Sequence, residues 1–180
     1  GFKGAFLDRT LFTNVALFKS KYKNQQVTVQ VPSLAGGIAS FVDNAGRGDI
    51  WGAELELRAV PSPNFSMNAA VGYTNADYKE FLTFITGGTT PVDVANAREF
   101  QNTPRFTASA SATASGDLLG GTISFTPAVS LRSDAYMFEI PTPALDPDGY
   151  FLVDASAAWT SPDDAFKLSV NLRNLTNERY

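Results

Sequence analysis

Apolar and polar side chains alternate along most of the chain, which is the pattern of a β-strand with one face turned to an apolar environment. Six segments show it cleanly: 51–59, 65–73, 106–113, 123–131, 151–159 and 166–172. Residues 1–6 and 11–29 alternate less regularly and are interpreted as two further strands. The sequence therefore predicts about eight strands and almost no helix.

Charged residues are confined to one side of these segments. The apolar sides carry none, whereas the opposite sides carry Glu54, Glu56, Arg58, Asp154, Lys167 and Arg173. A cation on the lipid-facing side of a membrane strand costs roughly 2–4 kcal/mol near the bilayer midplane, so a lipid-facing stripe should lack charge. The core of a soluble β-sandwich would exclude charge as well, and alternation alone leaves both architectures open.

The connections between the predicted strands alternate in length. The short ones contain Pro, Gly, Asn or Asp and lie at 7–10, 61–64, 116–120 and 161–164. The long ones run over about 30–45, 81–103 and 138–149. Short turns on one side of a membrane and long loops on the other are typical of outer-membrane barrels.

Aromatic residues mark both ends of the apolar stripes. Those beside the short turns are Phe65, Trp159 and Phe166. Those beside the long loops are Trp51, Tyr73, Phe106 and Phe151. Two aromatic girdles around an apolar band indicate the two interfaces of a bilayer. The sequence thus favours an all-β fold, an antiparallel up-and-down transmembrane β-barrel, of which this chain is a fragment of about eight strands.

The composition removes several classes of function. The chain has no histidine and no cysteine, so the usual catalytic triads, imidazole metal sites and thiolate zinc sites are excluded. Its net charge is −4 and its Lys and Arg residues are scattered, which argues against nucleic-acid binding. We predict no catalytic residue, no metal site and no cofactor, and we do not expect an enzyme.

Two glutamates are the most suggestive candidates for a binding site. Glu54 and Glu56 are two residues apart on one strand, so they project together into the lumen, as in a cation site or an acid/base pair. A solvated lumen wall, neutralised by Arg58 or by a residue of a plug, gives the same pattern and is the simpler interpretation. The full set of lumen-facing ligand candidates is Glu54, Glu56, Arg58, Arg132, Asp154 and Arg173.

Five short motifs occur in a suggestive order. Residues 44–57 read NAGRGDIWGAELEL, 70–78 read AVGYTNADY, 102–106 read NTPRF, 132–136 read RSDAY and 171–180 read NLRNLTNERY. In order and spacing they resemble strands from the C-terminal part of TonB-dependent outer-membrane receptors. In the last motif the tyrosine falls one or two places later than in the family pattern.

The resemblance implies a plugged parent barrel of about 22 strands. Residues 1–180 would be the C-terminal portion of that barrel, without the plug domain, the N-terminal strands or the final strand. The implied protein is an active transporter in the outer membrane of a Gram-negative bacterium. It would take up a scarce solute such as a ferric siderophore and be energised by the TonB complex, which would bind the missing N-terminal region. The other implied partner is the outer-membrane bilayer.

Three alternatives remain open on the sequence. A small autonomous eight-stranded barrel with a structural or adhesion role would need its first and last strands to pair. A soluble carbohydrate-binding β-sandwich would need two packed sheets. An outer-membrane hydrolase would need catalytic groups, and the absence of histidine weighs against it.

Overall fold

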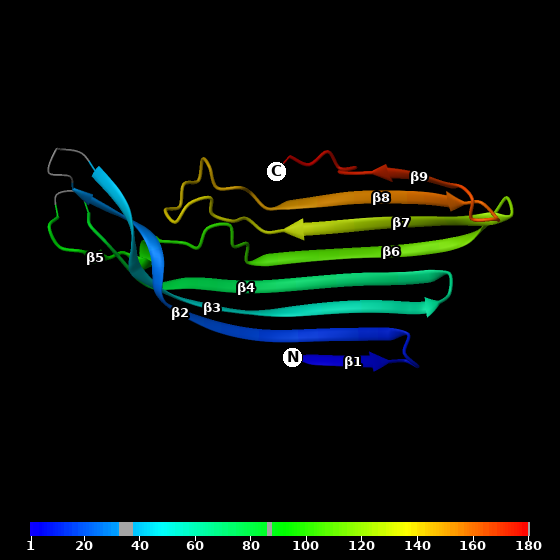
Figure 1. Cartoon of the computed structure of the whole chain (residues 1–180), viewed down its shortest axis with the longest axis horizontal. Coiled ribbons are helices and arrows are strands. Elements are labelled where there is room, and N and C mark those ends of the chain that lie inside the picture. Colours follow the sequence, from blue (N-terminus) through cyan, green and yellow to red (C-terminus); the bar gives the residue numbers. More distant parts are fainter. Residues whose placement is uncertain (33–37, 86–87, 180) are drawn as a thin grey trace.

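The computed structural model describes residues 1–32, 38–85 and 88–179. These residues form one antiparallel sheet (Figure 1) whose main strands are β1 (Phe2–Phe6), β2 (Leu11–Pro32), β3 (Ile38–Ser62), β4 (Phe65–Thr83), β6 (Phe106–Leu118), β7 (Gly121–Arg132), β8 (Tyr150–Thr160) and β9 (Lys167–Leu172). The short strand β5 (Val92–Asp93) pairs with the end of β4, and the 3₁₀ helix η1 (Ala95–Ala97) follows it. The prediction of about eight up-and-down strands is confirmed.

Within the described ranges, no helix has the length and apolar character needed to cross a membrane.

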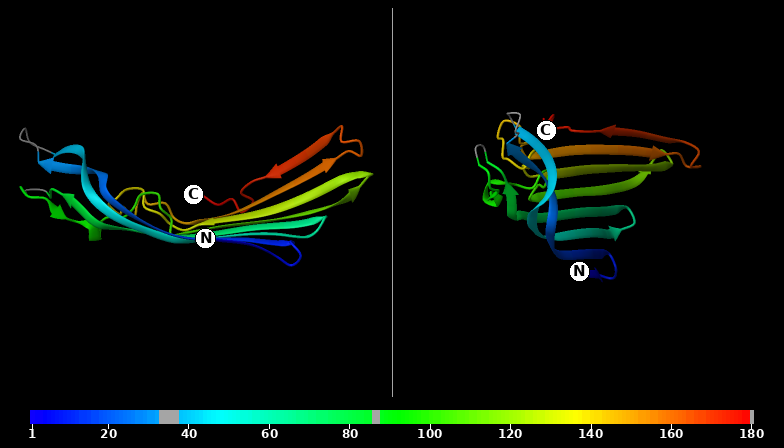
Figure 2. Two further views of the ribbon diagram at one scale, coloured as in Figure 1. Left: turned by 60° about the horizontal axis from the view of Figure 1, so that its bottom comes forward. Right: turned by 60° about the vertical axis from the view of Figure 1, so that its left-hand side comes forward.

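The main strands follow one another in chain order, and the sheet remains a single curved layer (Figure 2). Strands β1 and β9 are its two edges, and no pairing between them occurs in the described part of the chain. The two-layer sandwich and the self-closed eight-stranded barrel therefore both disagree with the structure. What the chain forms is a section of barrel wall.

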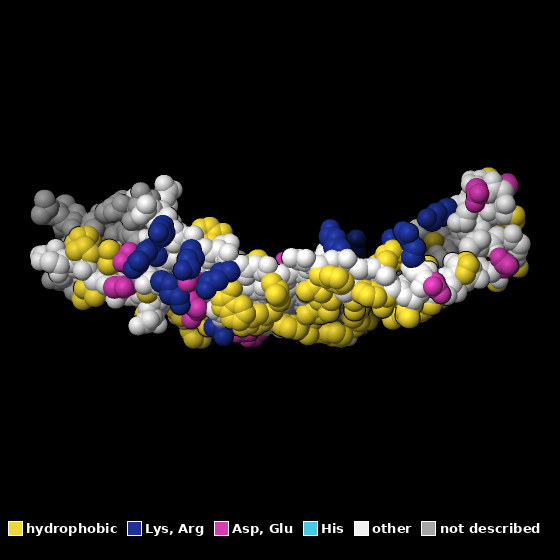
Figure 3. Space-filling model, turned by 90° about the horizontal axis from the view of Figure 1, so that it is seen from below, with side chains coloured by type: hydrophobic (Ala, Val, Ile, Leu, Met, Phe, Trp, Pro, Cys, Tyr) yellow, Lys and Arg dark blue, Asp and Glu magenta, His cyan; other side chains and the backbone are white. Residues whose placement is uncertain are grey.

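Strand register gives the sheet two chemically distinct faces, because residues directly opposite each other in neighbouring antiparallel strands point to the same side. One apolar row crosses the sheet through Val15, Leu55, Val71, Ala108, Leu131 and Phe151. The adjoining row on the other face runs through Asn14, Glu56, Ala70, Ser109, Ser130 and Leu152. Apolar side chains gather on the convex face (Figure 3), so the predicted lipid-facing stripe is confirmed.

Aromatic side chains lie at both ends of the convex apolar band, as predicted. Trp51 and Tyr73 lie beside the long loops, with ring centroids 5.4 Å apart. Trp159 lies beside the short turns, where its indole Nε1 donates a hydrogen bond to the carbonyl of Leu118 at 2.9 Å. Phe166 lies just before β9, which begins at Lys167.

The prediction of a long loop over 30–45 is wrong. Strand β2 continues to Pro32 and β3 begins at Ile38, and these two residues are partners in the register. The sequence on either side, VTVQV and IASFV, is rich in β-branched and aromatic residues, which favour strands. Pro, Gly and Asp residues in this stretch suggested a loop, but residues 38–45 lie inside β3. The hairpin of β2 and β3 therefore extends well past the aromatic girdle that contains Trp51.

Candidate ligand-binding site

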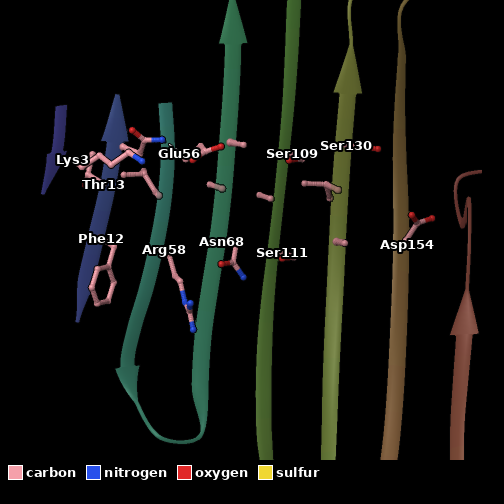
Figure 4. Close-up of a pocket in the computed structure, with 17 residues that line it drawn as sticks. Lys3, Phe12, Thr13, Glu56, Arg58, Asn68, Ser109, Ser111, Ser130 and Asp154 are labelled. Atoms are coloured by element: carbon pink, nitrogen blue, oxygen red, sulfur yellow. Dashed lines mark hydrogen bonds between the residues drawn. The ribbon is translucent and has the colours of Figure 1, made fainter. Parts of the chain in front are cut away.

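The concave face contains a cavity of about 650 Å³ that spans most of the sheet. Its labelled lining residues (Figure 4) come from β1, β2, β3, β4, β6, β7 and β8: Lys3, Phe12, Thr13, Glu56, Arg58, Asn68, Ser109, Ser111, Ser130 and Asp154. The centre of the lining is made of Ser and Ala residues, so the wall is shallow and wide there. Charged groups lie toward its two sides.

Strand alternation places Glu54, Glu56 and Arg58 together on the concave face, and all three are exposed. The amide Nδ2 of Asn14 on β2 donates a hydrogen bond to Oε2 of Glu56 at 2.9 Å. Among the described side chains, Arg58 forms no ion pair with either glutamate. Arg58 thus lies on the same face as the two glutamates without pairing with them, and neutralisation by a residue of a plug stays a prediction.

Asp154 lines the same cavity from β8 but already has a structural partner. Its Oδ1 accepts a hydrogen bond from the backbone N–H of Asn174 at 2.7 Å. The side chain is half-buried beneath the segment that follows β9. Asp154 therefore contributes negative charge to the concave face and also holds that segment in place.

The two remaining candidates lie apart from this cavity. Arg132 ends β7 beside a long loop, and its guanidinium carbon lies 5.1 Å from the ring centroid of Tyr150. Its Nε is buried and finds no hydrogen-bond partner among the described residues. Arg173 directly follows β9 and is exposed. The six predicted residues thus divide into Glu54, Glu56, Arg58 and Asp154 on the central wall, Arg132 at its loop end, and Arg173 near the β9 edge.

No group of three or more acidic side chains in the described ranges is arranged to hold a metal ion.

Sequence reasoning missed an aromatic cluster that holds the long loop after β4. Tyr78 and Phe81 are buried, with ring centroids 5.1 Å apart in an edge-to-face arrangement. Phe100, from the loop, stacks on Tyr78 with centroids 4.2 Å apart. Gly48 on β3 leaves room for this ring, because a Cβ there would lie 2.6 Å from Cζ of Phe100. The loop therefore folds back onto the extended ends of β3 and β4.

The side chain of Asp93 anchors the same loop by accepting hydrogen bonds from backbone N–H groups. Its Oδ1 accepts hydrogen bonds from the N–H groups of Phe81 and Ala95, each at 3.0 Å. These two bonds hold the pKa of Asp93 below its usual value, and the charge of Arg47 acts in the same direction. Beyond the aromatic girdle, burial raises the pKa of Tyr78, and the nearby Glu139 adds to the effect.

The two long loops on this side contact each other. The N–H of Glu99 donates to the carbonyl of Glu139, and the N–H of Asn102 donates to that of Tyr136, both at 2.9 Å. A polar hollow of about 230 Å³ lies between the loops and β4, lined in part by Arg105 and Asp134. No local sequence signal could have found this contact, because it joins segments far apart in the chain.

The sequence matches the family model described as TonB dependent receptor-like, beta-barrel, over residues 1–175. The chain belongs to this family. Barrels of TonB-dependent receptors are proteins of the Gram-negative outer membrane, and that is where this wall section lies. The family resemblance inferred from the five motifs is confirmed, and so is the predicted localisation.

Solved structures show the same fold. PiuA, described as a siderophore receptor from Acinetobacter baumannii, is 21% identical with a TM-score of 0.72, over 99% of this chain and 24% of its own. FyuA, the ferric yersiniabactin uptake receptor from Yersinia pestis, is 21% identical with a TM-score of 0.68, over 95% of this chain and 23% of its own. Fiu, the ferric-catecholate import receptor from K12 E. coli, is 17% identical with a TM-score of 0.66, over 99% of this chain and 22% of its own.

The chain thus spans about a quarter of the length of these receptors. No curated protein matches the sequence at significant similarity.

Proposed function

We propose that this chain is the C-terminal part of the barrel of an outer-membrane active transporter that takes up a scarce solute of the ferric siderophore type. The observation that carries the proposal is the family match over residues 1–175, on a sheet whose concave face is polar and whose convex face is apolar. FyuA and Fiu are described as uptake or import receptors for ferric ligands. Their likeness to this chain supports the ligand class.

The open edges support a longer parent protein. In lipid, each unpaired backbone N–H or C=O group costs several kcal/mol, so spanning sheets close into barrels. Strands β1 and β9 have free edges in the described part of the chain. The strands that complete the wall, and a plug that fills the lumen, belong in this proposal to the rest of the polypeptide. Coupling to the TonB complex belongs to that remainder as well.

The proposed mechanism is binding followed by gated passage, without bond chemistry. The concave wall offers exposed carboxylates at Glu54 and Glu56 and a guanidinium at Arg58, separated from Asp154 by Ser and Ala side chains. Such a wall stays hydrated and lets a polar ligand pass without a deep, tight site. Capture is assigned to the long-loop end, where the loops after β4 and β7 contact each other.

Uptake measurements on a deletion strain test the proposal. The gene that encodes the full receptor is deleted, and accumulation of radiolabelled iron is measured from a panel of ferric siderophores. We expect uptake of one of them to be lost, and to return with the wild-type gene only when the TonB complex is intact. Unchanged iron uptake together with lost uptake of a corrinoid or glycan would contradict the ligand class. Restored uptake without the TonB complex would contradict the energy source.

A further inference from the structure

The convex face changes from apolar to basic at one level of the sheet. On β2 the outward positions include Val15 and then Leu17, which is 75% exposed. The next outward positions are Lys19 and Lys21, and Lys23 follows them where β2 has no register partner; all three are exposed. Figure 3 shows Lys and Arg side chains gathered beside one end of the apolar band. We call Lys19, Lys21 and Lys23 the lysine row.

The lysine row begins at the aromatic girdle. Lys19 lies directly opposite Trp51 on β3, and Trp51 contacts Tyr73 on β4. One step farther from the apolar band, Lys21 lies opposite Asp49, which in turn lies opposite Asp77. All three strands therefore change from apolar to charged residues at the same height, as expected where a bilayer's hydrocarbon gives way to its headgroups.

The amines of the lysine row have no protein partner. Of the nearby acids, Asp77 pairs with Lys79 at 3.5 Å. Within the described residues, Lys19, Lys21 and Lys23 form no hydrogen bond and no ion pair. Asp49 lies opposite Lys21 without forming an ion pair with it, so the three lysines outnumber the unpaired acid beside them and keep their amines free at the margin of the lipid-facing surface.

The dimensions of the row fit the headgroup layer. Alternate residues of a strand are about 7 Å apart, so the row spans about 14 Å along β2. With a strand tilt of about 45°, this is roughly 10 Å along the membrane normal. Long lysine side chains can also lie along apolar surface and extend their amines into the polar layer. The row thus covers the depth at which lipid phosphates lie.

We propose that Lys19, Lys21 and Lys23 bind the phosphate groups of an anionic lipid in the outer leaflet. The long loops mark this end of the strands as the cell exterior. The positive charge, its lack of protein partners and its continuity with the apolar band together favour a lipid, whose acyl chains lie against the band while its phosphates meet the amines. The site does not depend on which solute the receptor transports.

Lipid binding to the purified full-length receptor tests the proposal. Native mass spectrometry in detergent measures the affinity for lipid A with two phosphates and for the dephosphorylated lipid with the same acyl chains. We expect the phosphorylated lipid to bind more tightly. The double variant Lys19→Gln/Lys21→Gln should lower its affinity about ten-fold or more, and added salt should weaken binding to the wild type more than to the variant.

The matched control removes the same charge from the opposite face. Lys3 and Lys167 point to the concave side, so Lys3→Gln/Lys167→Gln should leave lipid affinity unchanged. Heat-modifiable gel migration verifies that each variant is folded. Lys23 lies in the unpaired part of β2, so Lys23→Gln provides a second lysine-row variant that does not disturb strand pairing. Equal binding of both lipids, an equal loss in the control, or wild-type affinity in both lysine-row variants would each overturn the proposal.

Discussion

Oδ1 of Asp154 on β8 accepts a hydrogen bond from the backbone N–H of Asn174 at 2.7 Å. The whole of β9 lies between these two residues in the sequence. Asn174 in turn exchanges two hydrogen bonds with the backbone of Glu178, each at 2.8 Å. The N–H of Leu175 also reaches the carbonyl of Val153 at 2.8 Å. The Asn-Leu-Thr-Asn motif therefore forms a turn that is attached to β8 through Asp154.

Replacing Asp154 by alanine should loosen this turn. The substitution leaves the N–H of Asn174 without its acceptor in a half-buried setting, and such a loss costs about 1–3 kcal/mol. We expect a lower free energy of unfolding for the full receptor, measured by denaturant titration in detergent.

The control is Asp148→Ala, which removes an exposed aspartate from the loop before β8. Wild-type stability in this control together with a loss in Asp154→Ala supports the structural role. If instead Asp154→Ala is fully stable and only weakens ligand binding, the carboxylate serves the lumen and the turn does not need it.

The two faces of the sheet could be predicted from sequence because alternation is a local property. Whether Val71 faces lipid and Ala70 faces the lumen depends only on their order in β4 and on the overall pattern. Register then brings Leu55 and Val71 together without any further information. This is why the girdles and the apolar stripes were predicted in their correct places.

Contacts between distant segments could not be predicted in this way. Asp154 was a lumen candidate because polar and apolar residues alternate along its strand. Nothing near it in the sequence shows that its carboxylate accepts a hydrogen bond from the N–H of Asn174. The same holds for Phe100, a residue of the loop after β4 whose ring lies against Gly48 on β3. The extension of β2 to Pro32 was missed because the Pro, Gly and Asp residues of 30–45 were given more weight than the β-branched residues that precede and follow them.

The contact between Gly48 and Phe100 gives a second prediction. In Gly48→Ala the new Cβ would lie 2.6 Å from Cζ of Phe100, so the ring must leave its stacked position on Tyr78. We expect a loss of about 1–3 kcal/mol from overpacking and faster proteolysis of the loop after β4. Gly116→Ala is the matched control, since nothing lies within 4 Å of its Cβ. Equal protease resistance in both variants would contradict the anchoring role.

Asp93 makes the same loop sensitive to acid. The N–H groups of Phe81 and Ala95 lower the pKa of Asp93 in the folded protein. The stability that the ionised carboxylate gives the loop is therefore fully present at pH values above the usual carboxyl pKa of about 4. It is lost as the pH falls through the lowered pKa. Hydrogen exchange should show protected amides at Phe81 and Ala95 at neutral pH, and Asp93→Ala should expose both. Asp93→Asn keeps one acceptor but no charge, so its protection should not vary over the acidic range. Unchanged protection in Asp93→Ala would contradict the cap.

The indole of Trp159 stabilises the turn end of the sheet by a specific bond. Trp159→Phe keeps most of the ring but removes the Nε1–H that donates to Leu118, which should cost about 0.5–1.5 kcal/mol. Trp51→Phe is the matched control, because Trp51 makes a ring contact with Tyr73 at the opposite girdle. Unfolding in vesicles measures both. A larger loss in Trp51→Phe would mean that ring area, rather than the indole hydrogen bond, determines stability at the girdles.

The assignment of the two faces can be tested with one pair of adjacent residues. Ala69 lies on the convex face of β4, midway between the girdle residues Phe65 and Tyr73, and Ala70 lies on the concave face beside Glu56. Ala69→Arg places a cation in hydrocarbon, which should cost roughly 2–4 kcal/mol at the midplane, whereas Ala70→Arg places it in a hydrated cavity near a carboxylate and should cost little. The free energy of unfolding in vesicles distinguishes them, because both variants replace alanine by arginine and so change β-propensity and side-chain volume by the same amount. Equal losses would mean that the convex face is not in contact with lipid, since charge would then carry no penalty specific to that side.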